Sequence, residues 1–197
     1  MAVINLPATK SLTLTNRIPL GNINNKKLIV GNRKKDIYYS YLFFDIDKIP
    51  DNIVLLSAVL VLFKVSDFFP WRNKKFYIYP LLQEFSSFTT YENPCLIDLN
   101  PSLKKEFFPY TKNVAIEIDI TKLFSKWMNC LLVNQGIVIK DDSKAKLLRG
   151  CTSFGSANSK DKTLIPFIRV SFKEKNCCCI LPTEKLSYSA SITPNPN

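Results

Sequence analysis

The sequence has 197 residues, 46% of them hydrophobic and 12% aromatic, which is enough for one domain with a sizeable core. It carries 27 Lys and Arg against 16 Asp and Glu, and the net charge of +11 is compatible with contact with an anionic polymer. No nucleic-acid-binding motif accompanies this charge, so we do not expect a nucleic-acid partner. The absence of histidine excludes the commonest general base and metal ligand of proteins.

The first 35 residues are basic and contain no Asp or Glu. The start, MAVINLPATK, lacks the charged and apolar regions of a secretory signal peptide. Alternation in SLTLT at 11–15 and the apolar run LIVG at 28–31 predict two strands separated by a loop. Five residues around the second strand form a candidate basic patch for an acidic ligand: Lys26, Lys27, Arg33, Lys34 and Lys35.

The longest apolar stretch is IVLLSAVLVLF at 53–63. A membrane helix needs about 20 apolar residues, so this run is too short to cross a bilayer and we expect no membrane span. Its branched residues and lack of helical spacing predict a central strand buried on both faces. The aromatic run at 37–46 predicts the preceding strand, and the turn at 48–52 allows the two strands to pair as a hairpin.

Two aromatic loops flank the next strand. FYIYPLL at 76–82 predicts a strand that Pro80 shifts to an edge or a bulge. The loops at 68–73 and 107–110 each carry a candidate glycan-stacking residue, Trp71 in the first and Tyr110 in the second. The alternative is that these rings fold down onto the rim of the domain.

The segment VAIEIDI at 114–120 alternates between branched and polar residues, which predicts a strand with one wet face. A short helix is expected at 121–129, with Asp119 or Thr121 as its cap. Three apolar side chains at helical spacing form its predicted buried stripe: Leu123, Phe124 and Trp127.

Further strands are expected at 136–140, 146–154 and 165–172. Many short strands separated by turns predict an all-β fold, a jelly-roll-like antiparallel β-sandwich with one short helix, over residues 1–172. Residues 173–197 are polar and poor in apolar side chains, and we expect them to form an extended C-terminal tail.

No catalytic, metal or cofactor site is predicted, and we expect the chain not to be an enzyme. A glycosidase needs two carboxyl groups that face each other across a cleft, and the sequence does not place Glu84, Glu117 or Asp119 in that relation. Asp141 and Asp142 form a predicted turn pair that lacks the regularly spaced oxygen ligands of a calcium site.

Three of the six cysteines, Cys177, Cys178 and Cys179, are consecutive in the tail. Neighbours in an extended chain point in opposite directions, so these thiols are poorly placed to bind one metal ion. They are candidates for intermolecular disulfides. The alternative is a bond within the chain to one of the remaining cysteines, which are Cys95, Cys130 and Cys151.

Several short motifs follow one another in an order typical of one family. They are Leu6-Pro7-Ala8, Leu28-Ile29-Val30-Gly31, Tyr41-Leu42-Phe43-Phe44-Asp45-Ile46, Thr90-Tyr91, Asn93-Pro94, Asp119-Ile120-Thr121 and Gly136-Ile137. With them, residues 4–172 resemble the DNRLRE domain family, also described as a carbohydrate-binding-module-96-like or growth-factor-propeptide-like β-sandwich. The chain departs from that family at Leu82 and Tyr91, where the family usually has Trp.

Members of this family are non-catalytic modules of bacterial surface and exported proteins, and some resemble carbohydrate binders. The tandem tail cysteines are similar to those of endospore appendage proteins. The resemblance implies a binding or structural module, and we expect a structural module of a bacterial cell or spore surface. We expect it to form a homo-oligomer or homopolymer by strand addition, with Ala2–Thr15 or Ile180–Ile192 as the donor and disulfides as cross-links. The alternative is a carbohydrate-binding module for an acidic polysaccharide.

Overall fold

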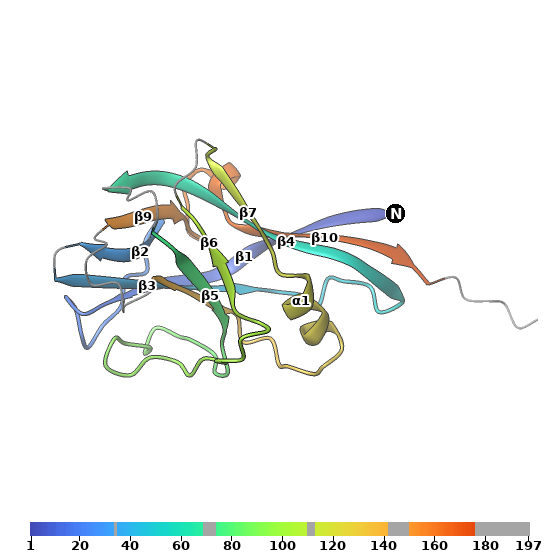
Figure 1. The fold of residues 1–197 in the computed structure, drawn as a ribbon, viewed down its shortest axis with the longest axis horizontal. Helices are drawn as coiled ribbons and strands as arrows, with labels where there is room; N and C mark the ends of the chain where they lie inside the picture. The colour runs from blue at the N-terminus through green and yellow to red at the C-terminus, as the bar shows by residue number, and fades with distance from the viewer. Residues whose placement is uncertain (34, 69–73, 110–112, 142–149, 176–197) are drawn as a thin grey trace, which may run out of the picture.

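The computed structural model describes residues 1–33, 35–68, 74–109, 113–141 and 150–175. Within them the chain is all-β, with one α-helix, α1 (Thr121–Met128), and one short 3-10 helix, η1 (Lys162–Leu164), as Figure 1 shows. The strands are β1 (Ala2–Thr15), β2 (Lys27–Arg33), β3 (Asp36–Phe44), β4 (Ile53–Phe68), β5 (Phe76–Pro80), β6 (Lys105–Phe107), β7 (Ala115–Asp119), β8 (Ile137–Asp141), β9 (Gly150–Gly155) and β10 (Phe167–Glu174).

Six antiparallel strands close into a barrel, in the order β1-β10-β4-β9-β2-β3 and back to β1. Closure depends on β1, which pairs with β10 through Ala2–Pro7 and with β3 through Ala8–Thr15, with a bulge after Ala8. Outside the barrel, β8, β5 and β6 extend the sheet from β3, and β7 pairs with β4.

The apolar strand β4 is central, as the sequence predicts, because it pairs with β10, β9 and β7. The predicted hairpin between β3 and β4 is wrong: within the described residues, β3 pairs with β1, β2 and β8 instead. The prediction that β4 is buried on both faces is correct only for Leu60–Leu62. Nearer the start of the strand, Val54 and Leu56 are 48% and 40% exposed. The first half of β4 projects beyond the barrel with β1 and β10, so its outer face meets solvent (Figure 1).

The main core fills the barrel and the space under α1. Residues of β3, β4, β8 and β10 alternate into it, and Phe44, Leu60, Ile139 and Val170 are fully buried. The predicted helical stripe is confirmed, since Leu123, Phe124 and Trp127 of α1 are all buried in this core. The predicted cap at Asp119 or Thr121 is wrong: Ile120 is the N-cap residue and makes no side-chain cap hydrogen bond. The Asp119 carboxylate instead accepts hydrogen bonds from the backbone N–H and the hydroxyl of Thr121, the first residue of α1.

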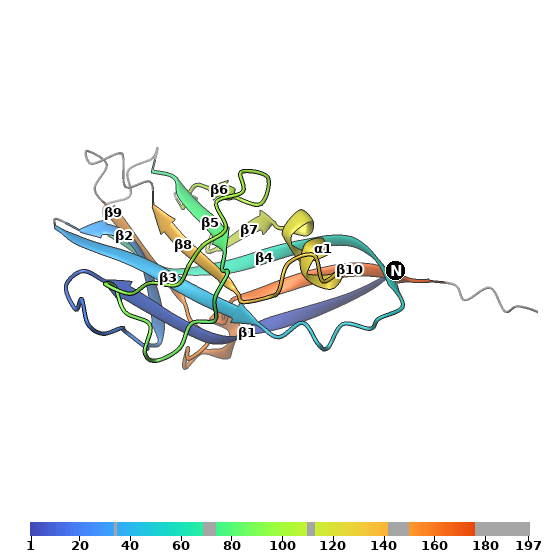
Figure 2. The same cartoon turned by 90° about the horizontal axis from the view of Figure 1, so that it is seen from below.

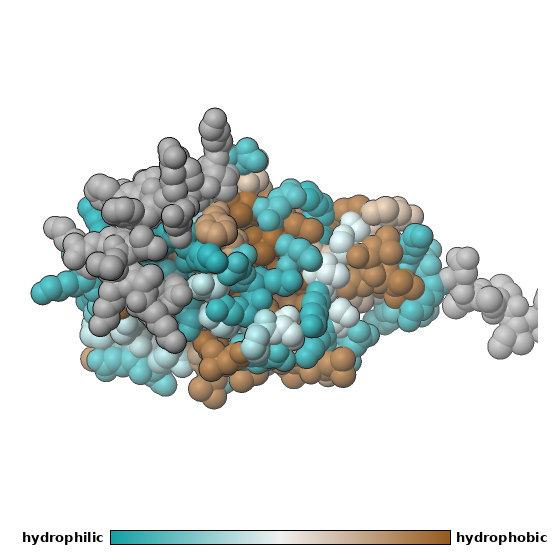
Figure 3. Space-filling model, in the orientation of Figure 1, coloured by the Kyte–Doolittle hydropathy of each residue, from teal (hydrophilic) through white to brown (hydrophobic). Residues whose placement is uncertain are grey.

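A second, smaller core lies on the outer side of β3 and β8, under the irregular segment 81–104. Figure 2 shows this segment, in green, crossing in front of β3. Leu81 and Phe85 are buried against Tyr41 and Val138, and this packing fixes the segment on the sheet. Other apolar side chains of the segment remain exposed: Leu82, Phe88, Leu96 and Leu99. Figure 3 shows hydrophobic areas, in brown, along the lower rim of the molecule.

Candidate functional site: a tyrosine–lysine face

The most distinctive surface for binding is the outer face of β3, β8 and β5. Side chains alternate along a strand, so Tyr77 and Tyr79 lie on the opposite face from Ile78, which is buried in the main core. Lys140 pairs in register with Tyr77 and shares its face. Two residues come from the covering segment. Together these residues form the tyrosine–lysine face, which consists of Tyr39, Tyr77, Tyr79, Tyr91, Lys104 and Lys140.

Both lysines lie over the same tyrosine rings. The Nζ of Lys104 is 3.8 Å from the ring centroid of Tyr77 and 5.5 Å from that of Tyr79. The Nζ of Lys140 is 4.8 Å from the ring centroid of Tyr79 and 6.0 Å from that of Tyr39. An ammonium within about 6 Å of an aromatic centroid is attracted by the electron-rich face of the ring. These contacts hold two positive charges side by side on one patch.

Neither lysine has a carboxylate within ion-pair distance in the described part of the chain. Burial lowers the pKa of Lys140, the charge of Lys104 lowers it further, and Asp141 acts in the opposite direction. Asp141 acts on Lys140 only from a distance, because it pairs with Lys74 on the inner side of β8. An anionic group placed between Lys104 and Lys140 would relieve their repulsion, so the face suits a negatively charged ligand.

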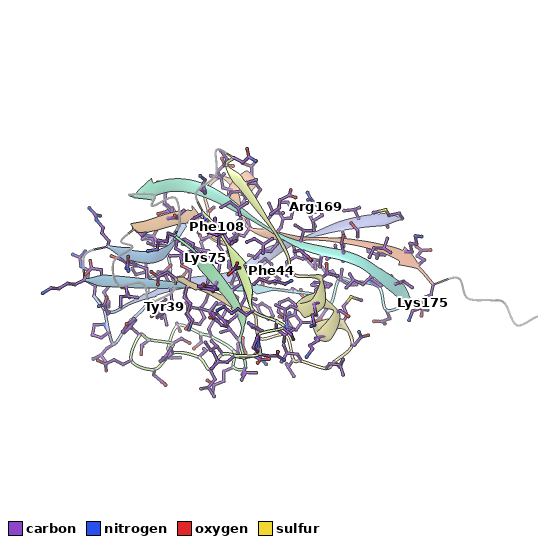
Figure 4. All side chains as sticks on the ribbon, viewed as in Figure 1. Tyr39, Phe44, Lys75, Phe108, Arg169 and Lys175 are labelled. Atoms are coloured by element: carbon purple, nitrogen blue, oxygen red, sulfur yellow. The ribbon has the colours of Figure 1, made fainter. Side chains whose placement is uncertain are left out.

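The tyrosines are held rigidly beneath the lysines. The rings of Tyr39 and Tyr91 stack with centroids 5.9 Å apart at 17°, and this contact pins the covering segment to β3. Burial, followed by the neighbouring Tyr91, raises the pKa of Tyr39 to about 12, so its hydroxyl stays protonated at neutral pH. In the view of Figure 4, Tyr39 and Arg169 lie on opposite sides of the buried Phe44, so the face is remote from the outer surface of β10.

The residues predicted from sequence for ligand binding do not make up this face. Trp71, Tyr110 and Lys34 lie outside the described residues. The predicted basic patch is divided between the two ends of β2. Lys26 and Lys27 lie at the start of this strand, whereas Arg33 and Lys35 lie at its far end. A strand of seven residues spans about 20 Å, so these exposed side chains form two separate groups.

The cysteines that the structure describes form no disulfide. Cys95 is half-buried within segment 81–104, Cys130 is exposed after α1, and Cys151 is buried in β9. Burial raises the pKa of both the Cys95 and the Cys151 thiols, which keeps them in the unreactive thiol form. Cys177, Cys178 and Cys179 lie outside the described residues, so their pairing stays a prediction.

The carboxylates considered for catalysis lie apart and have structural partners. Glu84 pairs with Lys10, and Glu117 of β7 pairs with Arg169 of β10 at 2.9 Å. The expectation of a turn pair at 141–142 is wrong for Asp141, which ends β8 and is buried in an ion pair with Lys74, while Asp142 lies outside the described residues. The described residues contain no cluster of His, Cys, Asp and Glu that could hold a metal ion.

Sequence reasoning missed the tyrosine–lysine face because its residues come from four separate segments. The sequence does contain one local signal for this face. Tyr77 and Tyr79 alternate in one predicted strand, and Lys140 is an isolated charge in another. No family model matches the sequence, and no curated protein matches it either. No helix in the described ranges is long and apolar enough to cross a membrane.

Proposed function

We propose that this chain is a non-catalytic binding module for an acidic polysaccharide, displayed on a bacterial cell or spore surface. The observation that carries the proposal is the convergence of Lys104 and Lys140 on Tyr79 without a carboxylate partner. The partly exposed Tyr79 and Tyr91 offer hydroxyl groups to sugars, and the two ammonium groups offer charge to uronate or phosphate groups. The family resemblance, to a jelly-roll-like sandwich that includes carbohydrate binders, points in the same direction.

Binding of a polyuronate such as alginate, measured by calorimetry at low and at physiological salt, tests this proposal. Electrostatic binding is expected to weaken steeply as salt is added, because screening shortens the range of the ammonium charges. Lys104→Gln and Lys140→Gln should each weaken binding about tenfold, the effect of losing about 1.4 kcal/mol. Lys122→Gln, which removes an exposed charge on α1, is the matched control.

Unchanged affinity in both face variants, or equal losses in the control, would contradict the proposed face. A broad panel of acidic glycans that shows no binding at low ionic strength would contradict the proposed function itself. Neutral glucans separate the two contributions: they can hydrogen-bond to the tyrosine hydroxyls but lack the charge, so they should bind far more weakly than the polyuronate.

A second candidate function is self-assembly into a homopolymer on the same surface. One observation favours it: residues Ala2–Pro7 of β1 pair with β10 on one edge and, in the described residues, have no strand on the other. Such an edge can accept a strand from a neighbour. Ala2–Thr15 pairs with β10 and β3 of its own barrel, so we propose the tail rather than this segment as the donor. Ile180–Ile192 lies outside the described residues and remains the proposed donor.

Gel electrophoresis distinguishes assembly from binding by a monomer. Intermolecular disulfides at Cys177, Cys178 and Cys179 should give ladders without reductant that collapse to 22.6 kDa with reductant. A variant with all three changed to Ser should lose the ladders, and the matched control Cys130→Ser, at an exposed cysteine, should retain them. A wild-type chain that stays monomeric in air would contradict the assembly.

A further inference from the structure

One charged cluster is almost completely withdrawn from solvent at an end of the barrel. Lys74 precedes β5, and its Nζ lies 3.1 Å from Oδ2 of Asp141 at the end of β8, with the two side chains 6% and 4% exposed. The same nitrogen donates a hydrogen bond of 3.0 Å to Oδ1 of Asn32 in β2. Lys74 also donates to the carbonyl of Gly150 and lies 5.7 Å from the ring centroid of Phe76.

This arrangement places an amine, a side-chain amide and a carboxylate in contact in apolar surroundings. We propose that Lys74 and Asn32 form an intramolecular amide bond with release of ammonia, and that Asp141 transfers the protons. The proposal is independent of the ligand and of assembly, since it concerns the chemistry of the buried Lys74 and Asp141 and the partly buried Asn32 within one chain.

The environment favours the reactive form of each partner. Burial lowers the pKa of Lys74, although Asp141 acts in the opposite direction. A proton passed from the ammonium to Asp141 leaves a neutral amine and a neutral carboxylic acid, which a low-dielectric site tolerates better than two charges. The Asn32 carbonyl oxygen also accepts a hydrogen bond from the backbone N–H of Gly150 at 3.2 Å, which polarises the carbonyl and stabilises negative charge on it.

The reaction balances without an oxidant or a cofactor. The lone pair of neutral Lys74 Nζ forms a bond to Cγ of Asn32, and the carbonyl electron pair moves onto Oδ1 beside the Gly150 N–H. Asp141 gives its proton to Nδ2 and takes one from the former amine. The bond from Cγ to Nδ2 then breaks, the carbonyl re-forms, and the nitrogen leaves as ammonia that carries the original lysine proton.

Backbone geometry keeps the three side chains close together. Asn32 pairs in register with Gly150, and Gly31 has a φ of +116°, a region that favours glycine. A β-carbon at Gly31 would lie 3.2 Å from Lys74 Nζ and would overlap the Gly150 carbonyl. The absence of a side chain at Gly31 lets the lysine amine reach the amide of Asn32.

Mass spectrometry of the intact, reduced and denatured chain tests the bond directly. We expect a mass below that of the sequence by one ammonia, and a branched tryptic peptide that joins Asn32 to Lys74. The unaltered mass would overturn the proposal. A loss of one water with a branch at Asp141 would also overturn it, because the acceptor would then be the carboxylate rather than the amide.

Variants identify the roles of the three residues. Lys74→Arg and Asn32→Ala should restore the full mass, and the matched control Lys75→Arg, at the neighbouring lysine that pairs with Glu106 on the surface, should retain the loss of ammonia. Asp141→Ala should restore the full mass although Lys74 and Asn32 remain, and formation of the bond in this variant would overturn the role of Asp141. If a variant fails to fold, the wild-type mass and peptide map still decide the proposal.

Discussion

Gly155 lies so close to Leu164 that a β-carbon on the glycine would overlap the leucine carbonyl oxygen. Gly155 ends β9 and Leu164 ends η1, so this contact seats the connection between β9 and β10 against the barrel. The opposing atom is backbone and cannot rotate away. The closeness of the two segments therefore depends on the missing side chain.

Gly155→Ala is expected to lower the free energy of unfolding by about 2–3 kcal/mol, because the backbone of η1 must move to admit a methyl group. Denaturation in urea measures the change. Gly21→Ala is the control, since its new β-carbon meets only a methyl group of the exposed Ile18, which can rotate. Equal losses in the two variants would show that the Leu164 contact is not the cause.

Thr13, Ser40 and Ile29 form a buried hydrogen-bond chain where β1, β2 and β3 meet. The Ser40 hydroxyl donates to the carbonyl of Ile29 at 2.8 Å, so the Thr13 hydroxyl donates to Ser40 at 2.9 Å and accepts from the Ile29 N–H at 3.3 Å. Thr13→Val keeps the shape but leaves polar groups unpaired, and should cost about 1–3 kcal/mol.

A double-mutant cycle with Ser40→Ala measures the coupling in this chain. The two changes together should cost less than the sum of the single changes, because either change alone already removes the hydrogen bond between the two hydroxyls. Strictly additive losses would contradict the linked chain.

Trp127 carries a buried Nε1 that has no hydrogen-bond partner among the described residues. Trp127→Phe removes this unpaired donor while retaining an aromatic ring, so it should change the free energy of unfolding by about 1 kcal/mol or less. Trp127→Ala removes the ring from the core beside Phe124 and should cost about 3–5 kcal/mol. Thermal and chemical denaturation of both variants check this, and a large loss in the Phe variant would indicate a hidden partner for Nε1.

Tyr39 is expected to ionise late in an alkaline titration, with a pKa of about 12 against an ordinary value of 10.0. Because the folded state binds this proton more tightly than the unfolded state, the associated stability is complete below pH 10 and is lost as the pH rises towards 12. Tyrosinate absorbance, compared between wild type and Tyr39→Phe, isolates the group. A difference curve centred near 10 would contradict the buried environment.

Local patterns predicted the parts of the fold that depend on one segment. The helical stripe of Leu123, Phe124 and Trp127 and the alternation in β7 each follow from the period of a single element, and both are present. The hairpin between β3 and β4 was wrong because pairing partners are chosen by the packing of the whole sheet. Strand neighbours such as β1 and β10 are separated by most of the chain, and no local pattern records them.

The two sites described above illustrate the same limit. From sequence, a lysine just before a strand, such as Lys74, is expected to be exposed to solvent. Its burial follows only from the way β2, β8 and β9 come together in the fold. Likewise, Lys104 in an irregular segment gives no sign that it covers Tyr77, because the path of segment 81–104 is set by burial of Leu81 and Phe85.

Closure of the barrel by β1 against β10 has a consequence for synthesis on the ribosome. Ala2 pairs with Phe172, so β1 leaves the exit tunnel well before β10, the strand that pairs with its outer half. Such distant pairing slows folding and leaves strand edges exposed in the meantime. We therefore expect the nascent chain to depend on chaperones until β10 has emerged, and a circular permutant that joins β10 directly to β1 to fold faster than the natural order.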